Sequence, residues 1–225
     1  MARSLGPVLD LLLPQRCVVC GADGTQLCGS CLRHLPRIEP PLCQLCGAPT
    51  AWPVRRCREC AGRRLAFASV RAAVSYDDAV RSFVTGWKER ALRRLAGAAV
   101  EIVIEVVPPP AVDVVTFVPP DFDRRLHRGH HPPRQLAERL AERWELPVAA
   151  RLRRRRAAGR QRGLSRTERR RNVAGIFAAA GKVPRAVVLV DDVFTSGATA
   201  NAAASALRKA GARRVDVVTF ARVVR

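Results

Sequence analysis

The sequence predicts an α/β protein with an open, mostly parallel sheet, preceded by a small cysteine-rich module. Two observations carry this prediction. β-Branched apolar runs alternate with helical segments after residue 65, which is the pattern of an α/β sheet with helices on both faces. All eight cysteines lie within the first 60 residues. We therefore expect two domains, a cysteine-rich module at 1–64 and an α/β domain at 65–225.

The cysteines form four pairs with two residues between partners. In a chain expected to be cytoplasmic, such pairs are typical of metal ligands, and two pairs complete a tetrahedral zinc site. A redox dithiol or a set of disulfides is the weaker alternative. The predicted ligands of two structural zinc ions are Cys17, Cys20, Cys28, Cys31, Cys43, Cys46, Cys57 and Cys60.

The order in which the pairs combine stays open at this stage. Intervals of seven, eleven and ten residues between pairs allow neighbouring pairs to share an ion, or the first pair to join the third. Either arrangement gives closed sites, which are structural rather than catalytic. Zinc then supplies folding free energy that a short segment with few large apolar residues lacks.

Several elements are expected before the last part of the chain. Short apolar or β-branched runs predict strands, and apolar residues at three- and four-residue steps predict helices. The expected order is a short helix or turn at 5–13, a strand at 67–76, a helix from 77 to 88, a helix at 92–107, a strand at 113–118 and a helix at 134–144.

The clearest pattern lies near the end of the chain. Val187–Val190 predicts a strand, Ala198–Ala210 a helix with Gly211 at its C-terminal end, and Val215–Phe220 a second strand. This strand–helix–strand unit implies two parallel strands joined by a right-handed crossover. In such sheets, ligands bind beyond the carboxyl ends of the strands.

The residues Asp191–Ala198 lie at that end of the predicted strand. A turn rich in hydroxyls and glycine directs free backbone N–H groups, and the positive end of a helix, toward an anion. The paired acids Asp191 and Asp192 are suited to ribose hydroxyls, directly or through a hydrated Mg²⁺. An acidic N-cap on a core helix is the alternative, but it leaves the Thr195-Ser196-Gly197 run unexplained. We expect a site for a phosphorylated sugar.

The run Val188–Thr199 resembles the phosphoribosyl-pyrophosphate (PRPP) signature of type I phosphoribosyltransferases. The segment Gln161–Val173, followed by Gly175 and Phe177, resembles the ComF family. Arg128-Gly129, the segment around Lys88 and the cysteine pairs do so too. The resemblance covers essentially the whole chain, and it implies a sheet of the type I phosphoribosyltransferase kind behind a zinc-ribbon-like module.

The resemblance also implies roles for individual residues. Asp191 and Asp192 are the expected catalytic acids, which bind the 2′- and 3′-hydroxyls of PRPP. The expected substrate-binding residues are Thr195, Ser196, Gly197, Ala198, Thr199, Lys88 and Arg128. The chain departs from the family after Arg128-Gly129, where it has His130-His131-Pro132-Pro133, and two prolines remove N–H donors from that turn.

Positive charge is concentrated near the expected site. Residues 151–172 contain eleven arginines and one acid, Glu168, and Ser165-x-x-Glu168 matches a capping box that starts a helix. Arginine grips phosphate oxygens bidentately, so this segment is a candidate for contact with pyrophosphate. The net charge of +21 favours phosphate-rich partners, including single-stranded DNA, although an arginine-rich composition alone gives the same total.

Two functions remain open from the sequence. One is Mg²⁺-dependent phosphoribosyl transfer with pyrophosphate release, in nucleotide metabolism or DNA uptake. The other is a non-catalytic PRPP- or nucleotide-binding competence protein that works with nucleic acid and with a partner such as a helicase. The apolar runs are too short for a membrane span and no signal peptide is evident, so we expect a cytoplasmic protein.

Overall fold

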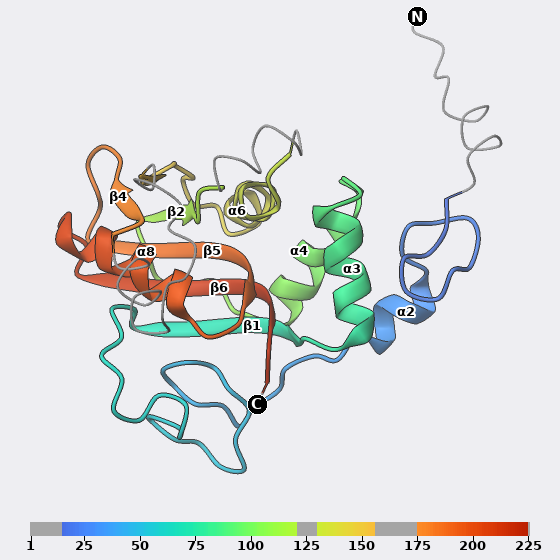
Figure 1. Ribbon diagram of the computed structural model, residues 1–225, viewed down its shortest axis with the longest axis horizontal. Coiled ribbons are helices and arrows are strands. Elements are labelled where there is room, and N and C mark those ends of the chain that lie inside the picture. Colours follow the sequence, from blue (N-terminus) through green and yellow to red (C-terminus); the bar gives the residue numbers. More distant parts are fainter. Residues whose placement is uncertain (1–14, 121–129, 156–174, 225) are drawn as a thin grey trace, which may run out of the picture.

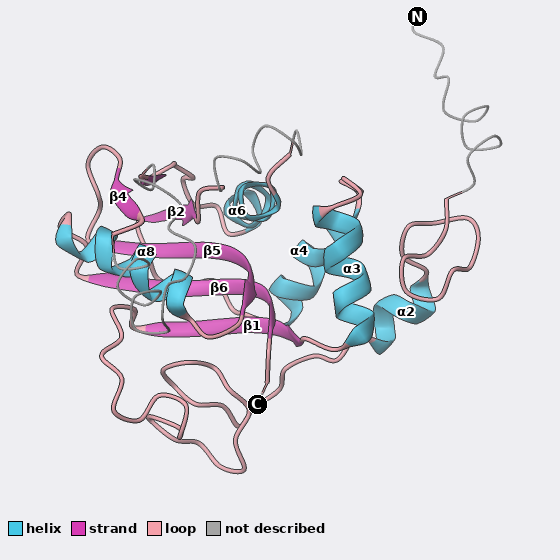
Figure 2. Ribbon diagram, in the orientation of Figure 1, coloured by secondary structure: helices cyan, strands magenta, loops and turns pink. Residues whose placement is uncertain are grey.

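The computed structural model describes residues 15–120, 130–155 and 175–224. Its centre is a four-stranded sheet with the order β1 (Ser69–Ser75), β6 (Arg214–Arg222), β5 (Ala186–Phe194) and β2 (Val114–Phe117). Every neighbouring pair in this sheet is parallel (Figures 1 and 2). The predicted open parallel α/β sheet is therefore confirmed.

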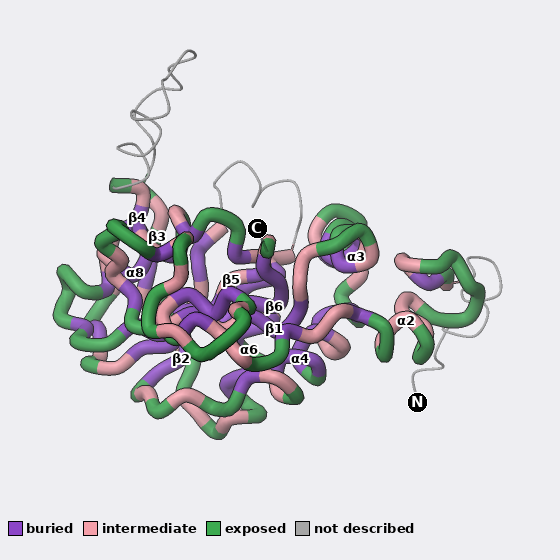
Figure 3. The backbone as a smooth tube through the Cα atoms, turned by 90° about the horizontal axis from the view of Figure 1, so that it is seen from below, coloured by how far each residue is buried: buried purple, intermediate pink, exposed green. Residues whose placement is uncertain are grey.

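Helices cover both faces of the sheet, as expected. One face carries α3 (Asp78–Lys88), α4 (Leu95–Val106) and α6 (Pro132–Arg143), whose buried residues form one core cluster with the strands. The other face carries α8 (Ala198–Lys209), which belongs to a second cluster. The sheet thus separates two apolar layers, and the strands are the most deeply buried part of the chain (Figure 3).

Strand β5 explains how one apolar run serves both layers. Val188 and Val190 belong to the cluster beneath α3, α4 and α6, whereas Val187 and Leu189 belong to the cluster beneath α8. Successive side chains of a strand point to opposite faces, so a continuous apolar run is the pattern of a strand buried on both sides. Strand β5 can therefore lie between the two apolar layers and pack against both.

The connections that follow β2 and β5 lie on opposite faces of the sheet and lead to opposite sides of this strand pair. After β2 the chain passes through α6 on one face to Val148, which bridges Val115 of β2. After β5 it passes through α8 on the opposite face to β6, on the other side of β5. A ligand site is expected at such a topological switch point, beyond the carboxyl ends of β2 and β5.

The predicted elements agree with the structure within a few residues, with three differences. Strand β5 continues to Phe194, past both acids, because Asp191 and Val193 still pair with β6. A short antiparallel pair, β3 (Leu152–Arg154) and β4 (Phe177–Ala179), was not expected. Helix α2 (Gly29–His34) was not expected either. The expected helix or turn at 5–13 lies outside the described residues.

The two halves of the cysteine-rich module contact different parts of the α/β domain (Figure 1). The first half lies beside α3, where Val18 packs against Gly86. A Cβ added to Gly86 would lie only 2.9 Å from Cγ1 of Val18. The second half lies along β1, where a Cβ on Gly47 would lie 2.4 Å from the carbonyl oxygen of Val70. Among the described residues, no helix is long and apolar enough to cross a membrane.

Candidate functional site

The candidate anion site is the turn between β5 and α8. Gly197 has φ 73°, the left-handed region that residues with a side chain disfavour. An added Cβ would lie 2.6 Å from Cζ of Phe194, so the ring below the turn also requires glycine. This conformation lets the chain turn from the strand into the helix within three residues, Thr195 to Gly197.

The first turn of α8 presents open backbone donors. No side chain caps the helix, and the first helical bond of the turn runs from the Asn201 N–H to the Gly197 carbonyl at 2.9 Å. The Ser196 hydroxyl accepts from the Ala198 N–H over 3.4 Å, which is a long contact. Thr195, Ser196 and Thr199 are exposed. N–H groups and hydroxyls therefore gather at the positive end of the helix.

The two acids lie just before this turn and differ in their surroundings. Asp192 is 9% exposed, and its Oδ2 lies 2.6 Å from the ammonium nitrogen of Lys88 at the end of α3. Its backbone N–H donates to Oδ1 of Asp191 at 2.9 Å. The structure thus brings Lys88, predicted from the family resemblance, to the acid pair across more than a hundred residues.

Burial and, after it, the adjacent Asp192 carboxylate raise the pKa of Asp191 to about 8. The Asp192 N–H, Lys88 and Arg154 act in the opposite direction but do not overcome these effects. Asp191 therefore keeps its proton to a higher pH than an ordinary carboxyl does. Such a displaced carboxyl pKa, beside a turn with open N–H donors, is typical of functional sites.

The predicted contacts from the β2 side are only partly described. Arg128 and most of the arginine-rich segment lie outside the described residues. His130 contacts the Trp87 carbonyl oxygen through Nε2 at 2.6 Å, and the His131 ring lies edge-on to Phe117 with centroids 5.7 Å apart. Neither histidine joins a cysteine group.

The cysteines form two candidate zinc centres, and neighbouring pairs combine. In each group the four sulfurs lie within 4.8 Å of one another, and none of the eight is in a disulfide. The Sγ atoms of Cys20 and Cys28 are 3.7 Å apart, and those of Cys46 and Cys57 are 3.5 Å apart. A tetrahedral site with Zn–S bonds of about 2.3 Å has edges of about 3.8 Å, so both groups fit zinc.

Backbone donors prepare some of these sulfurs for metal binding. The N–H groups of Cys28 and Cys57 donate to Sγ of Cys17 and Cys43 at 3.5 and 3.3 Å. Burial raises the pKa of the Cys17 thiol, but N–H donors from Cys20 and Cys28 outweigh it and bring that pKa to about 6. The pKa of Cys43 falls to about 7 for the same kind of reason. Thiolates are the form that binds zinc.

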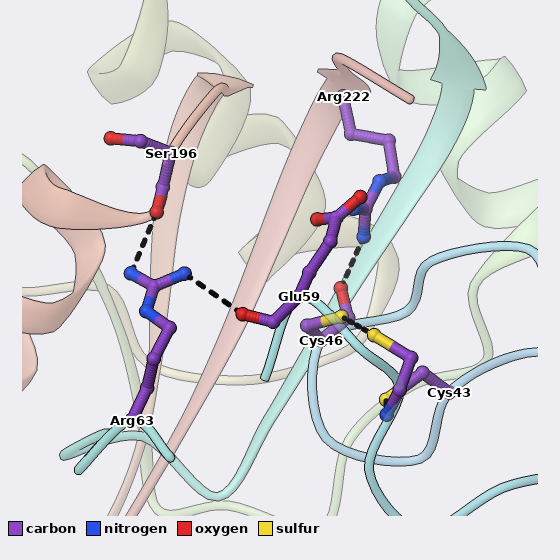
Figure 4. Close-up of polar contacts among 7 residues, drawn as sticks. Cys43, Cys46, Glu59, Arg63, Ser196 and Arg222 are labelled. Atoms are coloured by element: carbon purple, nitrogen blue, oxygen red, sulfur yellow. Dashed lines mark hydrogen bonds and ion pairs between the residues drawn. The ribbon is translucent and has the colours of Figure 1, made fainter. Parts of the chain in front are cut away.

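Two arginines near the site were not predicted from the sequence. Arg63 follows the second cysteine group and donates to the Ser196 carbonyl at 2.9 Å (Figure 4). Arg222 ends β6, is fully buried and donates to the Cys46 carbonyl. Nothing in the sequence distinguishes them, because they are two among 40 basic residues.

Comparisons with known proteins agree with this organisation. Residues 8–61 match the family model of the double zinc ribbon domain. The chain is 26% identical over 223 residues to Competence protein F of Haemophilus influenzae, covering 92% of this chain and 96% of that protein. The resemblance to the ComF family is thereby confirmed.

Two solved structures are similar over 56% of this chain, each with a TM-score of 0.37. One is the glutamine PRPP amidotransferase from B. subtilis complexed with ADP and GMP, at 27% identity. The other is described as the allosteric regulatory enzyme of purine biosynthesis, at 28% identity. The chain spans 25% of the length of each, and a TM-score this low gives neither likeness weight for function.

Proposed function

Starting from a ComF-like chain with an N-terminal double zinc ribbon, we propose that the turn Thr195–Thr199 binds the 5′-phosphate of PRPP or another ribose phosphate. Asp191 and Asp192 then receive the 2′- and 3′-hydroxyls of the same ribose. The domain from residue 65 to 225 is the phosphoribosyltransferase-like part, and residues 1–64 form the zinc module. We further propose that the protein works in the cytoplasm, where PRPP and nucleotides are found.

One observation carries this proposal: an uncapped helix N-terminus and an acid pair lie directly next to each other at the end of a central strand. The helix end favours a dianionic phosphate, and the carboxylates favour hydroxyl donors. A ligand that satisfies both needs a phosphate a few bonds away from vicinal hydroxyls. Ribose 5-phosphate groups have this arrangement.

The proposed reaction is transfer of the phosphoribosyl group. The bond between the anomeric carbon and the pyrophosphate oxygen breaks, its electron pair leaves with pyrophosphate, and a nucleophilic acceptor forms a new bond to that carbon. Positive charge develops on the sugar, so carboxylates that hold the ribose hydroxyls stabilise it. Nζ of Lys88 lies 2.6 Å from Oδ2 of Asp192 and holds that carboxylate in place.

Mg²⁺ is the metal that this chemistry implies. It binds through one or two carboxylates together with substrate phosphates and water. Asp191 and the free oxygen of Asp192 fit such a partner, since Lys88 occupies only Oδ2 of Asp192. When bound, the metal would neutralise charge on the departing pyrophosphate. The two zinc ions, by contrast, are structural.

Calorimetry and a pyrophosphate-release assay test the proposal. We expect the full chain to bind PRPP with Mg²⁺, and the double substitution Asp191→Asn and Asp192→Asn to abolish this binding. The matched control is Asp78→Asn, an acid 92% exposed in the first turn of α3. Equal PRPP binding by wild type and the double variant, or none by wild type, contradicts the proposal.

The second candidate is binding without turnover, in DNA uptake. The observation that favours it is the similarity to a protein named Competence protein F. On this reading, basic residues engage single-stranded DNA, and a competence-machinery partner such as a helicase completes the function. Tight PRPP binding without pyrophosphate release, with any base supplied as acceptor, favours this candidate. Its DNA binding should weaken steeply with rising salt.

A further inference from the structure

We propose that the second zinc ribbon, defined here by Cys43, Cys46, Cys57 and Cys60, is a structural part of the anion-binding turn. Arg63 and Arg222 are the positioning residues that connect them. This inference rests on the proposed function for what the turn binds, but its contacts are independent of that function. No feature of the ribbon's own sequence points toward the phosphate site.

Arg63 makes the direct connection. Its backbone N–H donates to the Cys60 carbonyl at 3.2 Å, so it directly continues the turn that holds two zinc ligands. Its guanidinium then donates to the Glu59 carbonyl at 3.5 Å and to the Ser196 carbonyl at 2.9 Å (Figure 4). One side chain thus joins backbone oxygens of the zinc turn and of the anion-binding turn.

The geometry of the peptide unit gives this bond its consequence. The Ser196 carbonyl and the Gly197 N–H belong to the same planar trans peptide, so they point in opposite directions. A donor that fixes the carbonyl toward the zinc ribbon therefore fixes the N–H away from it, on the side of the open helix end. Because glycine adopts both signs of φ readily, this peptide would otherwise rotate at little cost. Arg63 opposes that rotation.

Arg222 supports the same turn from below. Its guanidinium donates to the Cys46 carbonyl and to Oε2 of Glu59, the latter at 3.3 Å. It also lies 5.4 Å from the ring centroid of Phe194, the ring against which Gly197 packs. A fully buried cation thus ties both cysteine turns of the second ribbon to the floor of the anion-binding turn.

A third contact reaches the first turn of α8. The Ala66 N–H, a few residues after Arg63, donates to Oδ1 of Asn201 at 2.7 Å. The second ribbon and the segment after it therefore hold the turn at its carbonyl, beneath its ring and at its helix. The first cysteine group contacts α3 instead, through Val18 near Gly86. Of the two ribbons, as far as the described residues show, the second is the one that contacts the anion-binding turn.

The test compares Arg63→Ala with Arg58→Ala in the full, zinc-loaded chain. Both remove an exposed arginine from the second ribbon, but Arg58 lies between two zinc ligands and makes no side-chain bond to the described residues. Two measurements are made: the dissociation constant for ribose 5-phosphate by calorimetry, and amide hydrogen exchange of residues 195–200 without ligand. Zinc content is determined for each variant.

We expect Arg63→Ala to weaken ribose 5-phosphate binding about tenfold and to speed exchange in the turn by a similar factor, with two zinc ions retained. Arg58→Ala should match wild type in both measurements. Arg63→Lys, which keeps one donor, should recover part of the affinity. Because Arg58→Ala removes the same charge, its unchanged affinity shows that loss of charge alone does not explain the effect of Arg63→Ala. Equal affinity and equal exchange in Arg63→Ala and Arg58→Ala overturn the inference. If wild type binds no ribose 5-phosphate, the proposed function fails, and the exchange comparison still decides this inference.

Discussion

Replacing Asp191 with asparagine should stabilise the protein while removing its ligand affinity. The pKa of this carboxyl rises from 3.8 to about 8 on folding, because of burial and the neighbouring Asp192 carboxylate. A raised pKa means that the folded chain holds a proton that the unfolded chain has released. Asp191 therefore opposes folding increasingly as the pH rises from about 4, and its cost becomes constant above about 8.

The magnitude follows from the same shift. Each pKa unit corresponds to 1.36 kcal/mol, so the full shift sets an upper limit of about 6 kcal/mol above pH 8. The true cost is smaller than this limit, because Asp191 is only partly buried and its carboxylate accepts a hydrogen bond from the Asp192 N–H. We therefore expect a gain of about 2 kcal/mol from Asp191→Asn at pH 8. At pH 4.5 the gain should fall to about 1 kcal/mol, because a carboxyl with the ordinary pKa of 3.8 is already mostly ionised in the unfolded chain at that pH. Asparagine keeps the oxygen that accepts from Asp192, so the difference isolates the charge.

Urea unfolding followed by tryptophan fluorescence at pH 4.5, 6 and 8 measures this gain. For a chain of this size, about 2 kcal/mol corresponds to roughly 4–8 °C in Tm, so thermal scans provide a second readout. Asp78→Asn, on an exposed acid, is the control and should show no such growth with pH. A gain from Asp191→Asn that is equal at pH 4.5 and 8, or a loss at both, would refute the reasoning.

Two further predictions concern the turn and the zinc centres. Gly197→Ala should lower the free energy of unfolding by about 2 kcal/mol, since a left-handed alanine costs about 1–2 kcal/mol before the 2.6 Å approach to Phe194 is counted; unchanged urea midpoints would contradict this. Chelation should release two zinc ions per chain and expose residues 15–64 to proteolysis, because the metal supplies most of their folding free energy. Release of fewer ions, or resistance to proteolysis that persists after both are released, would show the zinc assignment to be wrong.

The secondary structure was largely predictable because its signals are local. The apolar run before Asp191, the alanine-rich segment after Gly197 and the β-branched run after Gly211 each predict their element from adjacent residues. The end of β5 was misjudged by four residues, since pairing with β6 extends the strand past two acids that disfavour it. The pair β3 and β4 was missed because each strand has only three residues, too few to show a strand periodicity.

The candidate site divides in the same way. Asp191, Asp192 and Gly197 could be predicted as site residues because they lie within one short segment of the sequence. Lys88 was found only through a family resemblance, and its bond to Asp192 crosses the core from α3 to β5. Arg128 and most of the arginine-rich segment lie outside the described residues, so their roles stay predictions.

By itself, the sequence determined that the chain builds a parallel sheet, a glycine turn between an apolar strand and the helix that follows it, and two metal-binding groups from four cysteine pairs. Spacing and periodicity along the chain were sufficient for these features. Only the tertiary structure decided that neighbouring cysteine pairs combine. It also decided that Arg63 bonds to Ser196, 133 residues away, and that Arg222 bonds to Cys46, 176 residues away. Long-range partners depend on how the layers pack, and identical arginines give the sequence no means of marking which of them are chosen.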